Sequence, residues 1–214
     1  MIGNLSLILS FIITLIGVVR FRKLTMPFKL LAVYLLYAFF LDLLNIYITE
    51  KYKTNAFLIQ IQTITNYILY SLIYYYLFKN ESIKKLILIL IIAVTVFFCI
   101  NALWLEPFLS AFPSNVNIAT QIIYVILSLL LFKQMLLYPN QINIIRQSIF
   151  WYNSAILFFA TTMFLNLGLM NYYSVHHYKY SIIIYFWYTI NIISNFLLGI
   201  AVLTDRKNIS SIEV

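Results

Sequence analysis

The chain has 214 residues, of which 64% are hydrophobic and 9% charged, and its formal net charge is +8. A soluble domain carries about 25% charged residues, so the composition excludes an ordinary soluble protein and predicts that most of the outer surface faces lipid. The length fits one domain over residues 1–214. The basic residues lie between apolar runs, where membrane topology explains them, and we therefore expect no nucleic-acid partner.

Seven apolar runs follow one another along the chain and predict an all-α fold, a polytopic membrane protein built as a seven-transmembrane-helix bundle. Spanning the hydrocarbon core takes about 20 mostly apolar residues, and each run approaches or reaches that length. In chain order, the expected helices cover residues 5–21, 30–48, 56–78, 86–105, 116–137, 149–170 and 182–203. Because Met1–Asn4 carries no basic side chain, we interpret the first run as a retained helix and not as a signal peptide.

The distribution of Lys and Arg predicts the orientation, because cytoplasmic loops of membrane proteins carry an excess of both residues. If the N-terminus is outside and the C-terminus cytoplasmic, the cytoplasmic side holds Arg20, Arg22, Lys23, Lys29, Lys79, Lys84, Lys85, Lys133, Arg146, Arg206 and Lys207. The outer side then holds only Lys51, Lys53 and Lys179. Every cytoplasmic connection is basic, so the sequence specifies this topology repeatedly.

Asp42 is the only ionisable residue well inside a predicted helix, in the outer half of residues 30–48. A charge at that depth costs several kcal/mol unless it is paired or neutralised, and no Lys or Arg lies deep enough to pair with it. Tyr34, Ala38 and Asn45 share its helix face by their three-to-four spacing. Two interpretations remain open: a ligand, proton or cation site, or an interhelical hydrogen bond that fixes the register of the bundle.

Polar residues also recur at intervals of four in three further predicted helices. These are Gln62, Asn66 and Tyr70 in 56–78, Thr162 and Asn166 in 149–170, and Trp187, Asn191 and Asn195 in 182–203. Amides and hydroxyls in lipid need partners, so these faces should point inward. Structural hydrogen bonds explain each stripe taken alone. Together with Asp42 and Asn45, the ten residues are candidate ligand-binding residues lining a cavity open to the outer side.

Several kinds of site are missing from the sequence. Residues 182–203 contain no Lys for a retinal Schiff base, and no predicted helix contains a His for haem or metal ligation. His176 and His177 are adjacent in a loop, where their side chains diverge, and Cys99 has no second thiol to pair with. There is no Gly-rich phosphate-binding motif. We therefore expect no catalytic, cofactor-binding or metal-binding residues, and a protein that is not an enzyme.

Four segments together resemble a known group of proteins. They are the basic turn Arg20–Lys23 before the acid-bearing helix, Asn66–Tyr76, Ser148–Tyr152 and Trp187–Asn195. This order is similar to that of uncharacterised small seven-helix inner-membrane proteins of Gram-negative bacteria, often encoded beside sensor histidine kinases. The group often carries a glutamate after the asparagine of its third helix, where this chain has Leu69 and Tyr70. The resemblance implies a multi-pass protein of the bacterial inner membrane and implies no established chemistry.

Two functional hypotheses follow. The first is a sensory, signalling or accessory subunit that binds a ligand or a partner's helices through the polar-lined bundle, and whose output passes to a membrane signalling partner or through a homo-oligomer. The alternative is a small-solute or proton-coupled transporter that uses Asp42. The polar stripes lie mainly in the central and outer parts of the helices, which favours a pocket reachable from one side.

Overall fold

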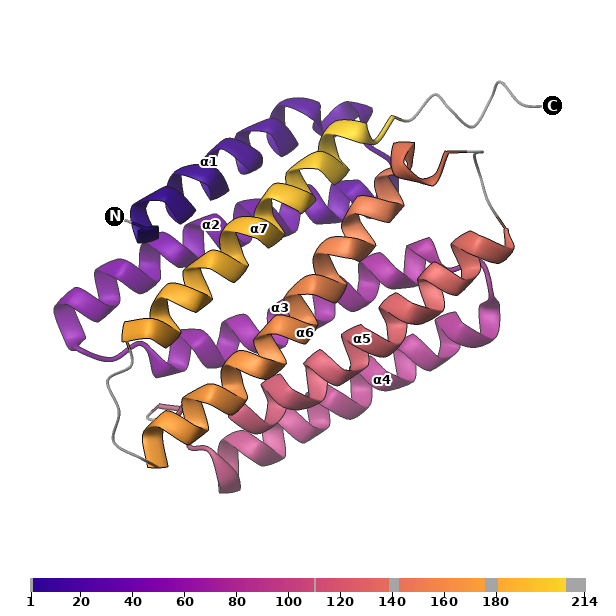
Figure 1. Ribbon diagram of the computed structural model, residues 1–214. Coiled ribbons are helices and arrows are strands. Elements are labelled where there is room, and N and C mark those ends of the chain that lie inside the picture. Colours follow the sequence, from indigo (N-terminus) through magenta and orange to yellow (C-terminus); the bar gives the residue numbers. More distant parts are fainter. Residues whose placement is uncertain (1, 110, 139–142, 176–180, 207–214) are drawn as a thin grey trace.

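The computed structural model describes residues 2–109, 111–138, 143–175 and 181–206, and these ranges are helical apart from the connections (Figure 1). The long helices are α1 (Ile2–Arg20), α2 (Met26–Tyr52), α3 (Ala56–Leu77), α4 (Glu81–Ile100), α5 (Ser114–Leu137), α6 (Ser148–Val175) and α7 (Ser181–Thr204). Three short turns adjoin them: η1 (Phe21–Lys23), η2 (Asn101–Leu105) and η3 (Ile144–Arg146). The seven spans are long and apolar enough to cross a membrane, which confirms the prediction of an all-α chain with seven such helices.

Most helices extend past the apolar runs by which they were predicted. The largest difference is in α2, which was expected over 30–48 and instead covers Met26–Tyr52, with Pro27 in its first turn. The ends of a spanning helix lie at headgroup level, where polar residues can continue the helix at little cost. At the start of α4, the Asn80 side chain accepts hydrogen bonds from the backbone N–H groups of Ser82 and Ile83, at 2.8 and 3.4 Å.

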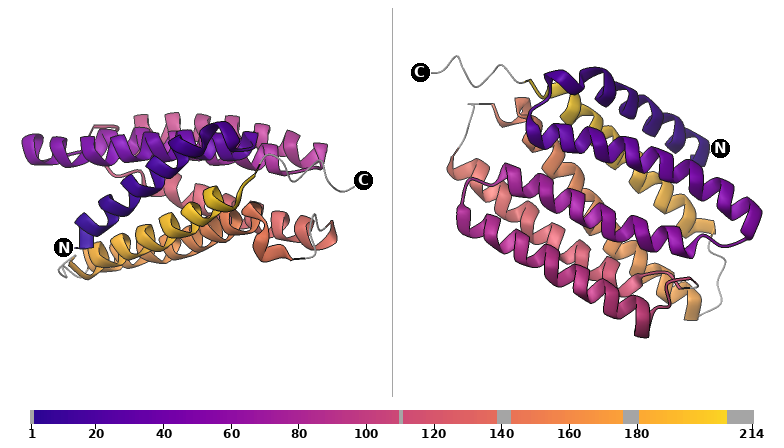
Figure 2. Two further views of the ribbon diagram at one scale, coloured as in Figure 1. Left: turned by 90° about the horizontal axis from the view of Figure 1, so that it is seen from above. Right: turned by 180° about the vertical axis from the view of Figure 1, so that it is seen from behind.

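The helices form a closed ring in which each packs against its neighbours in the chain, and α7 returns to pack against α1. Viewed from above, α2, α3 and α4 lie in one layer and α6 and α7 in the other (Figure 2, left). From its N-terminus, α1 crosses from the second layer to the first (Figure 2). On the other side of the ring, α5 packs against α6, α3 and α4. The space between the layers is therefore enclosed by helices all round.

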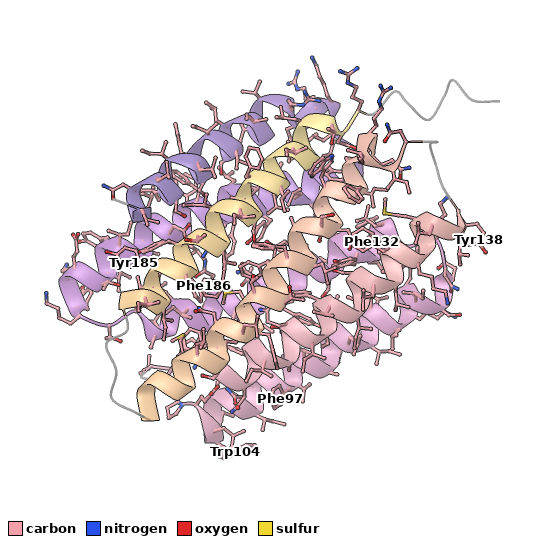
Figure 3. The ribbon with its side chains drawn as sticks, viewed as in Figure 1. Phe97, Trp104, Phe132, Tyr138, Tyr185 and Phe186 are labelled. Carbon is pink, nitrogen blue, oxygen red and sulfur yellow. The ribbon has the colours of Figure 1, made fainter. Side chains whose placement is uncertain are left out.

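One end of the bundle, where α1 ends and α2 begins, is strongly basic and is called the basic end below. Of the described Lys and Arg residues, those at this end are Arg20, Arg22, Lys23, Lys29, Lys79, Lys84, Lys85, Lys133, Arg146 and Arg206. Lys51 and Lys53 lie at the opposite end. Trp104 and Tyr138, exposed to 75% and 65%, lie towards the opposite and the basic end respectively (Figure 3), as aromatic residues at two membrane interfaces do.

The first two helices, α1 and α2, bury few side chains near the opposite end of the bundle. The buried residues of α2 are Phe28, Leu31, Ala32 and Leu35, all in its first ten positions. Those of α1 are Ser10, Ile13, Thr14 and Gly17, none of them in its first eight positions. Leu24, between these two helices, is fully buried. α1 and α2 are thus held to the bundle mainly near the basic end, whereas α3, α5 and α6 also bury residues towards the opposite end, among them Gln60, Val116 and Asn166.

A buried polar network joins three helices near the basic end. The Tyr74 hydroxyl of α3 lies 2.6 Å from Ser128 Oγ of α5 and donates to Asn153 Oδ1 of α6 at 3.0 Å. Asn153 Nδ2 in turn donates to the backbone oxygen of Ser128 at 2.9 Å. All three residues are fully buried. Each polar group has a partner from another helix, so the network fixes the register of α3, α5 and α6.

We expect Tyr74→Phe to lower the free energy of unfolding by about 0.5–2 kcal/mol, because the Tyr74 hydroxyl is lost while Ser128 and Asn153 stay buried. Unfolding of the purified protein in mixed micelles measures the change. Tyr76→Phe, at a 47% exposed position of the same helix, is the matched control and should unfold like the wild type. Equal stability of the two variants would contradict this role of the network.

Asp205 fastens the end of α7 to the start of α2 and α6 at the basic end. Its Oδ2 accepts a 2.7 Å hydrogen bond from the backbone N–H of Thr25, and its Oδ1 accepts one of 3.3 Å from Ser148 Oγ. The Arg20 guanidinium donates to the Asp205 backbone oxygen at 3.0 Å. Burial raises the pKa of the Asp205 carboxyl, against the opposing influence of the Thr25 and Ser148 hydrogen bonds and the Arg20 charge.

Because the pKa of Asp205 is higher in the folded chain, the folded state binds the proton more tightly than the unfolded state. The stabilisation is complete below the unfolded pKa and is lost as the pH rises through the folded pKa. Melting temperatures measured from about pH 4 to about pH 7 should therefore fall less in Asp205→Asn than in the wild type. Identical pH profiles would show that Asp205 titrates as it does in the unfolded chain.

Candidate functional site

Two adjoining cavities lie between the layers of the bundle. The inner cavity has a volume of about 150 Å³ and the outer cavity about 660 Å³. Six residues line both and form the neck between them: Asp42, Ile59, Gln62, Trp187, Asn191 and Asn195. Asp42, the acidic residue predicted from the sequence to bind a ligand, thus lies where the two cavities meet.

The outer cavity is lined by α1, α2, α3 and α7. It lies towards the end of the bundle at which α1 diverges from α2 (Figure 2, left). Its rim includes Asn4 at the start of α1, Glu50 at the end of α2 and Asn55 before α3, so it reaches the surface at the opposite end. Along its wall, Asn55 Nδ2 donates to Asn45 Oδ1, and Asn45 Nδ2 donates to Gln62 Oε1, both at 3.4 Å. A chain of amides therefore leads from the rim to the neck.

Tyrosine rings form the floor of the inner cavity on the side of the basic end. Tyr34 and Tyr70 have ring centroids 4.5 Å apart, and Tyr70 meets Tyr124 edge-on at 5.6 Å. Below them, Tyr152 packs against Tyr70 at 6.5 Å and against Phe28 at 6.3 Å. Tyr152 and Phe28 are almost completely buried. The cavity is therefore closed towards the basic end by several layers of packed side chains.

Three oxygen atoms in the lining of the inner cavity are buried without a protein partner: Asn66 Oδ1, Gln121 Oε1 and Ser194 Oγ. Gln121 is 4% and Ser194 6% exposed. A buried polar atom without a hydrogen bond costs about 1–3 kcal/mol, and such atoms in a native protein call for an explanation. A polar molecule held in the cavity would supply the missing hydrogen bonds.

The structure brings most of the predicted site residues together. Asp42, Gln62, Asn66, Tyr70, Trp187, Asn191 and Asn195 line the inner cavity, and Asn45 lines the outer one. Asp42 is half-buried and interacts with the Gln62 side chain of α3. Among the residues that the structure describes, none with a positive charge pairs with this carboxyl.

The two predicted residues of α6 lie elsewhere. Thr162 and Asn166 line neither cavity, and the Thr162 hydroxyl donates to the backbone oxygen of Phe158, one turn earlier in its own helix, at 2.6 Å. Asn166 is fully buried. The residues that α6 does contribute to the inner cavity are apolar: Ala155, Ile156, Phe159 and Met163. A Thr hydroxyl can donate its hydrogen bond to the backbone of its own helix. A stripe of polar residues therefore need not face a cavity.

The polar wall provided by α5 was missed in the sequence. Asn117, Thr120, Gln121 and Tyr124 all line the inner cavity. Asn117 Nδ2 donates to Thr63 Oγ1 of α3 at 3.3 Å. Their spacing of three to four residues places them on one helix face, and it is the signal that could have identified them. Phe112, in the connection before α5, also reaches the inner cavity, and nothing in its sequence context indicates this.

The lining offers a defined set of chemical groups. Its carboxyls are Asp42 and Glu50, and the described lining residues include no Lys, Arg or His. Within the described ranges, no three His, Cys, Asp or Glu side chains come together as a metal-binding group. His176 and His177 lie outside the described residues. The arrangement can bind a small polar or charged molecule through one carboxyl, several amides and aromatic rings.

Comparisons with protein-family models, with curated proteins and with solved structures found no match.

We expect the neck to be open to water and the core below it to be closed. In a Cys99→Ser background, which removes the exposed native thiol, Gln62→Cys should react rapidly with a water-soluble methanethiosulfonate reagent in detergent. Ser71→Cys is the matched control on the same helix, because Ser71 is 1% exposed and lines neither cavity. Equally fast labelling at both positions would contradict a bundle that is closed below the neck.

Proposed function

We propose that this protein is a non-enzymatic sensory or signalling subunit of a membrane, which binds a ligand in the polar cavity between its helices. The observation that carries the proposal is the asymmetry of the bundle. The cavity reaches the surface at the opposite end, while the basic end is closed by the Tyr74 network, by Asp205 and by fully buried aromatic rings. A site reachable from one side suits detection of a molecule better than its passage.

The distribution of charge supports an orientation for this site. Ten of the described Lys and Arg residues lie at the basic end and two at the opposite end. By the positive-inside rule, the basic end is cytoplasmic and the cavity faces the outer side. This gives an outside N-terminus and a cytoplasmic C-terminus. The resemblance to small seven-helix proteins encoded beside sensor kinases supports a bacterial inner-membrane location.

The output of such a subunit would pass through its helices. The described connections between the helices are short. We therefore propose that ligand binding is relayed to a membrane signalling partner, or to a second copy of the chain, through lipid-facing helix surfaces. The loose packing of α1 and α2 near the cavity supports this route, because a ligand can draw these two helices together there.

The proposed role does not involve catalysis. The inner cavity holds one carboxyl, Asp42, and its lining offers no His, Lys or Cys as a base or nucleophile among the described residues. Acid–base catalysis needs groups within hydrogen-bond reach of the reacting atoms.

A transporter is the second candidate, favoured by the position of Asp42 at the neck. Intramembrane acids are found in proton-coupled pathways. Transport would require a second state, in which the basic end opens and the outer cavity closes. That state would break the buried hydrogen bonds of Tyr74 and separate Asp205 from Thr25.

Sidedness of labelling distinguishes the two candidates. Gln62→Cys in the Cys99→Ser background should react with an impermeant cationic thiol reagent in right-side-out vesicles and not in inside-out vesicles. Lys53→Cys and Lys84→Cys, at the two ends, calibrate the outer and inner faces. Labelling of Gln62→Cys from both sides would favour the transporter. Labelling only in inside-out vesicles, with calibration sites reversed, would overturn the orientation.

A further inference from the structure

The lining of the two cavities has a charge opposite to that of the protein as a whole. The chain carries a net charge of +8, yet the cavities contain the carboxyls of Asp42 and Glu50 and no basic side chain among the described residues. Low-dielectric walls focus the field of such charges into the cavity. The two cavities therefore attract cations and repel anions.

Asp42 has acceptor capacity that the protein leaves unused. Its interaction with Gln62 occupies part of one carboxyl, and no cationic side chain from the described helices approaches it. A carboxylate has about four acceptor positions, and a charge within a helix bundle is costly until it is paired. A positively charged donor at the neck would complete this site.

The other unsatisfied groups also call for a donor. Asn66 Oδ1, Gln121 Oε1 and Ser194 Oγ are all oxygens that can accept hydrogen bonds. Asp42 lies 16 residues after the start of α2, and Gln121 lies 16 residues before the end of α5, both counted from the basic end. The two side chains therefore lie at a similar height in the bundle. One ammonium group offers up to three N–H donors to Asp42 and Gln121, whereas Asn66 and Ser194, 11 and 10 residues from the basic end, lie deeper in the cavity.

The rest of the inner cavity suits the body of a small organic cation. Trp187 borders the neck, and Tyr34, Tyr70 and Tyr124 form the floor of the inner cavity; an aromatic ring face within about 6 Å attracts a cation by about 0.5–2 kcal/mol. The α6 wall of Ala155, Ile156, Phe159 and Met163 is apolar. A volume of about 150 Å³ is that of a cavity that accommodates benzene.

We infer that the neck and inner cavity bind a small organic ammonium ion, with its charged nitrogen at Asp42 and an apolar body of about benzene size against α6. The inference rests on the proposed ligand-binding function and names the chemical class of the ligand. An inorganic cation would use the carboxyl and the amides and leave the apolar wall empty. A neutral apolar molecule would leave Asp42 and the unpaired oxygens unsatisfied.

Binding of three matched probes to the full chain in nanodiscs tests the inference. The 2-phenylethylammonium ion should bind and raise the melting temperature, and neutral 2-phenylethanol and anionic phenylacetate should bind at least about tenfold more weakly. Equal binding of the alcohol, or no response to the amine, would overturn the inference. Stabilisation by sodium chloride at equal concentration, as large as that by the amine, would also overturn it, in favour of an inorganic cation.

Variants locate the site of binding. Asp42→Asn should weaken amine binding by about tenfold or more, and Glu81→Gln, which removes an exposed carboxyl at the other end of the bundle, should not. If Asp42→Asn does not fold, a second measurement replaces it. A thiol at Gln62 should react faster with trimethylammonium-ethyl methanethiosulfonate than with its sulfonate analogue, relative to the rates at Lys53→Cys. Equal relative rates, or unchanged binding in a folded Asp42→Asn, would overturn the inference.

Failure of this inference can be separated from failure of the proposed function. If the cavity is labelled from the outer side alone and the amine does not bind, a one-sided site stands and the ligand class is wrong. If the amine binds and the cavity is labelled from both sides, the ligand class stands and the chain is a transporter of amines.

Discussion

A polar side chain inside a membrane bundle needs a hydrogen-bond partner, and the Tyr74 network and the lining of the inner cavity meet this constraint in different ways. Near the basic end, Tyr74, Ser128 and Asn153 satisfy one another across three helices. Farther along the same bundle, Asn66, Gln121 and Ser194 have buried oxygens with no protein partner. At the opposite end, Asn101 is paired with Glu106 and Asn115, and away from both cavities Tyr152 and Asn166 have unpaired atoms. The three unpaired oxygens that line the inner cavity are acceptors available to a molecule held there.

Hydrogen bonds at the basic end join the ends of α1 and α7 to the starts of α2 and α6. Asp205 ties the end of α7 to the starts of α2 and α6, and the Arg20 guanidinium holds the backbone of Asp205. These bonds fix the helices at one end, so that α1 can diverge from α2 towards the other end without loss of the fold (Figure 2). Movements of α1 or α2 near the cavity would pivot on this fixed end.

The sequence predicted the seven spans because about 20 apolar residues are a strong and local signal. It placed Asp42, Gln62 and Asn191 near one another because an acid or amide in lipid must face inward. It could not place Thr162, whose hydroxyl bonds its own backbone, since a threonine on a polar face looks the same in either case. Gln121 was also missed from the sequence. Whether its helix borders the cavity depends on how the helices pack around the ring, and the sequence of α5 alone does not show this. The divergence of α1 from α2 has no counterpart in local sequence.

We propose that the space at the neck is a binding site and not a packing defect. A cryo-electron microscopy map of the protein in nanodiscs, purified without added ligand and again with 2-phenylethylammonium, tests this directly. We expect non-protein density beside Asp42 in the amine-loaded sample, with the Tyr74 network and the Asp205 hydrogen bonds unchanged in both samples. A neck filled by side chains of α2, α3 and α7 in both maps, with no room for a ligand, would contradict it.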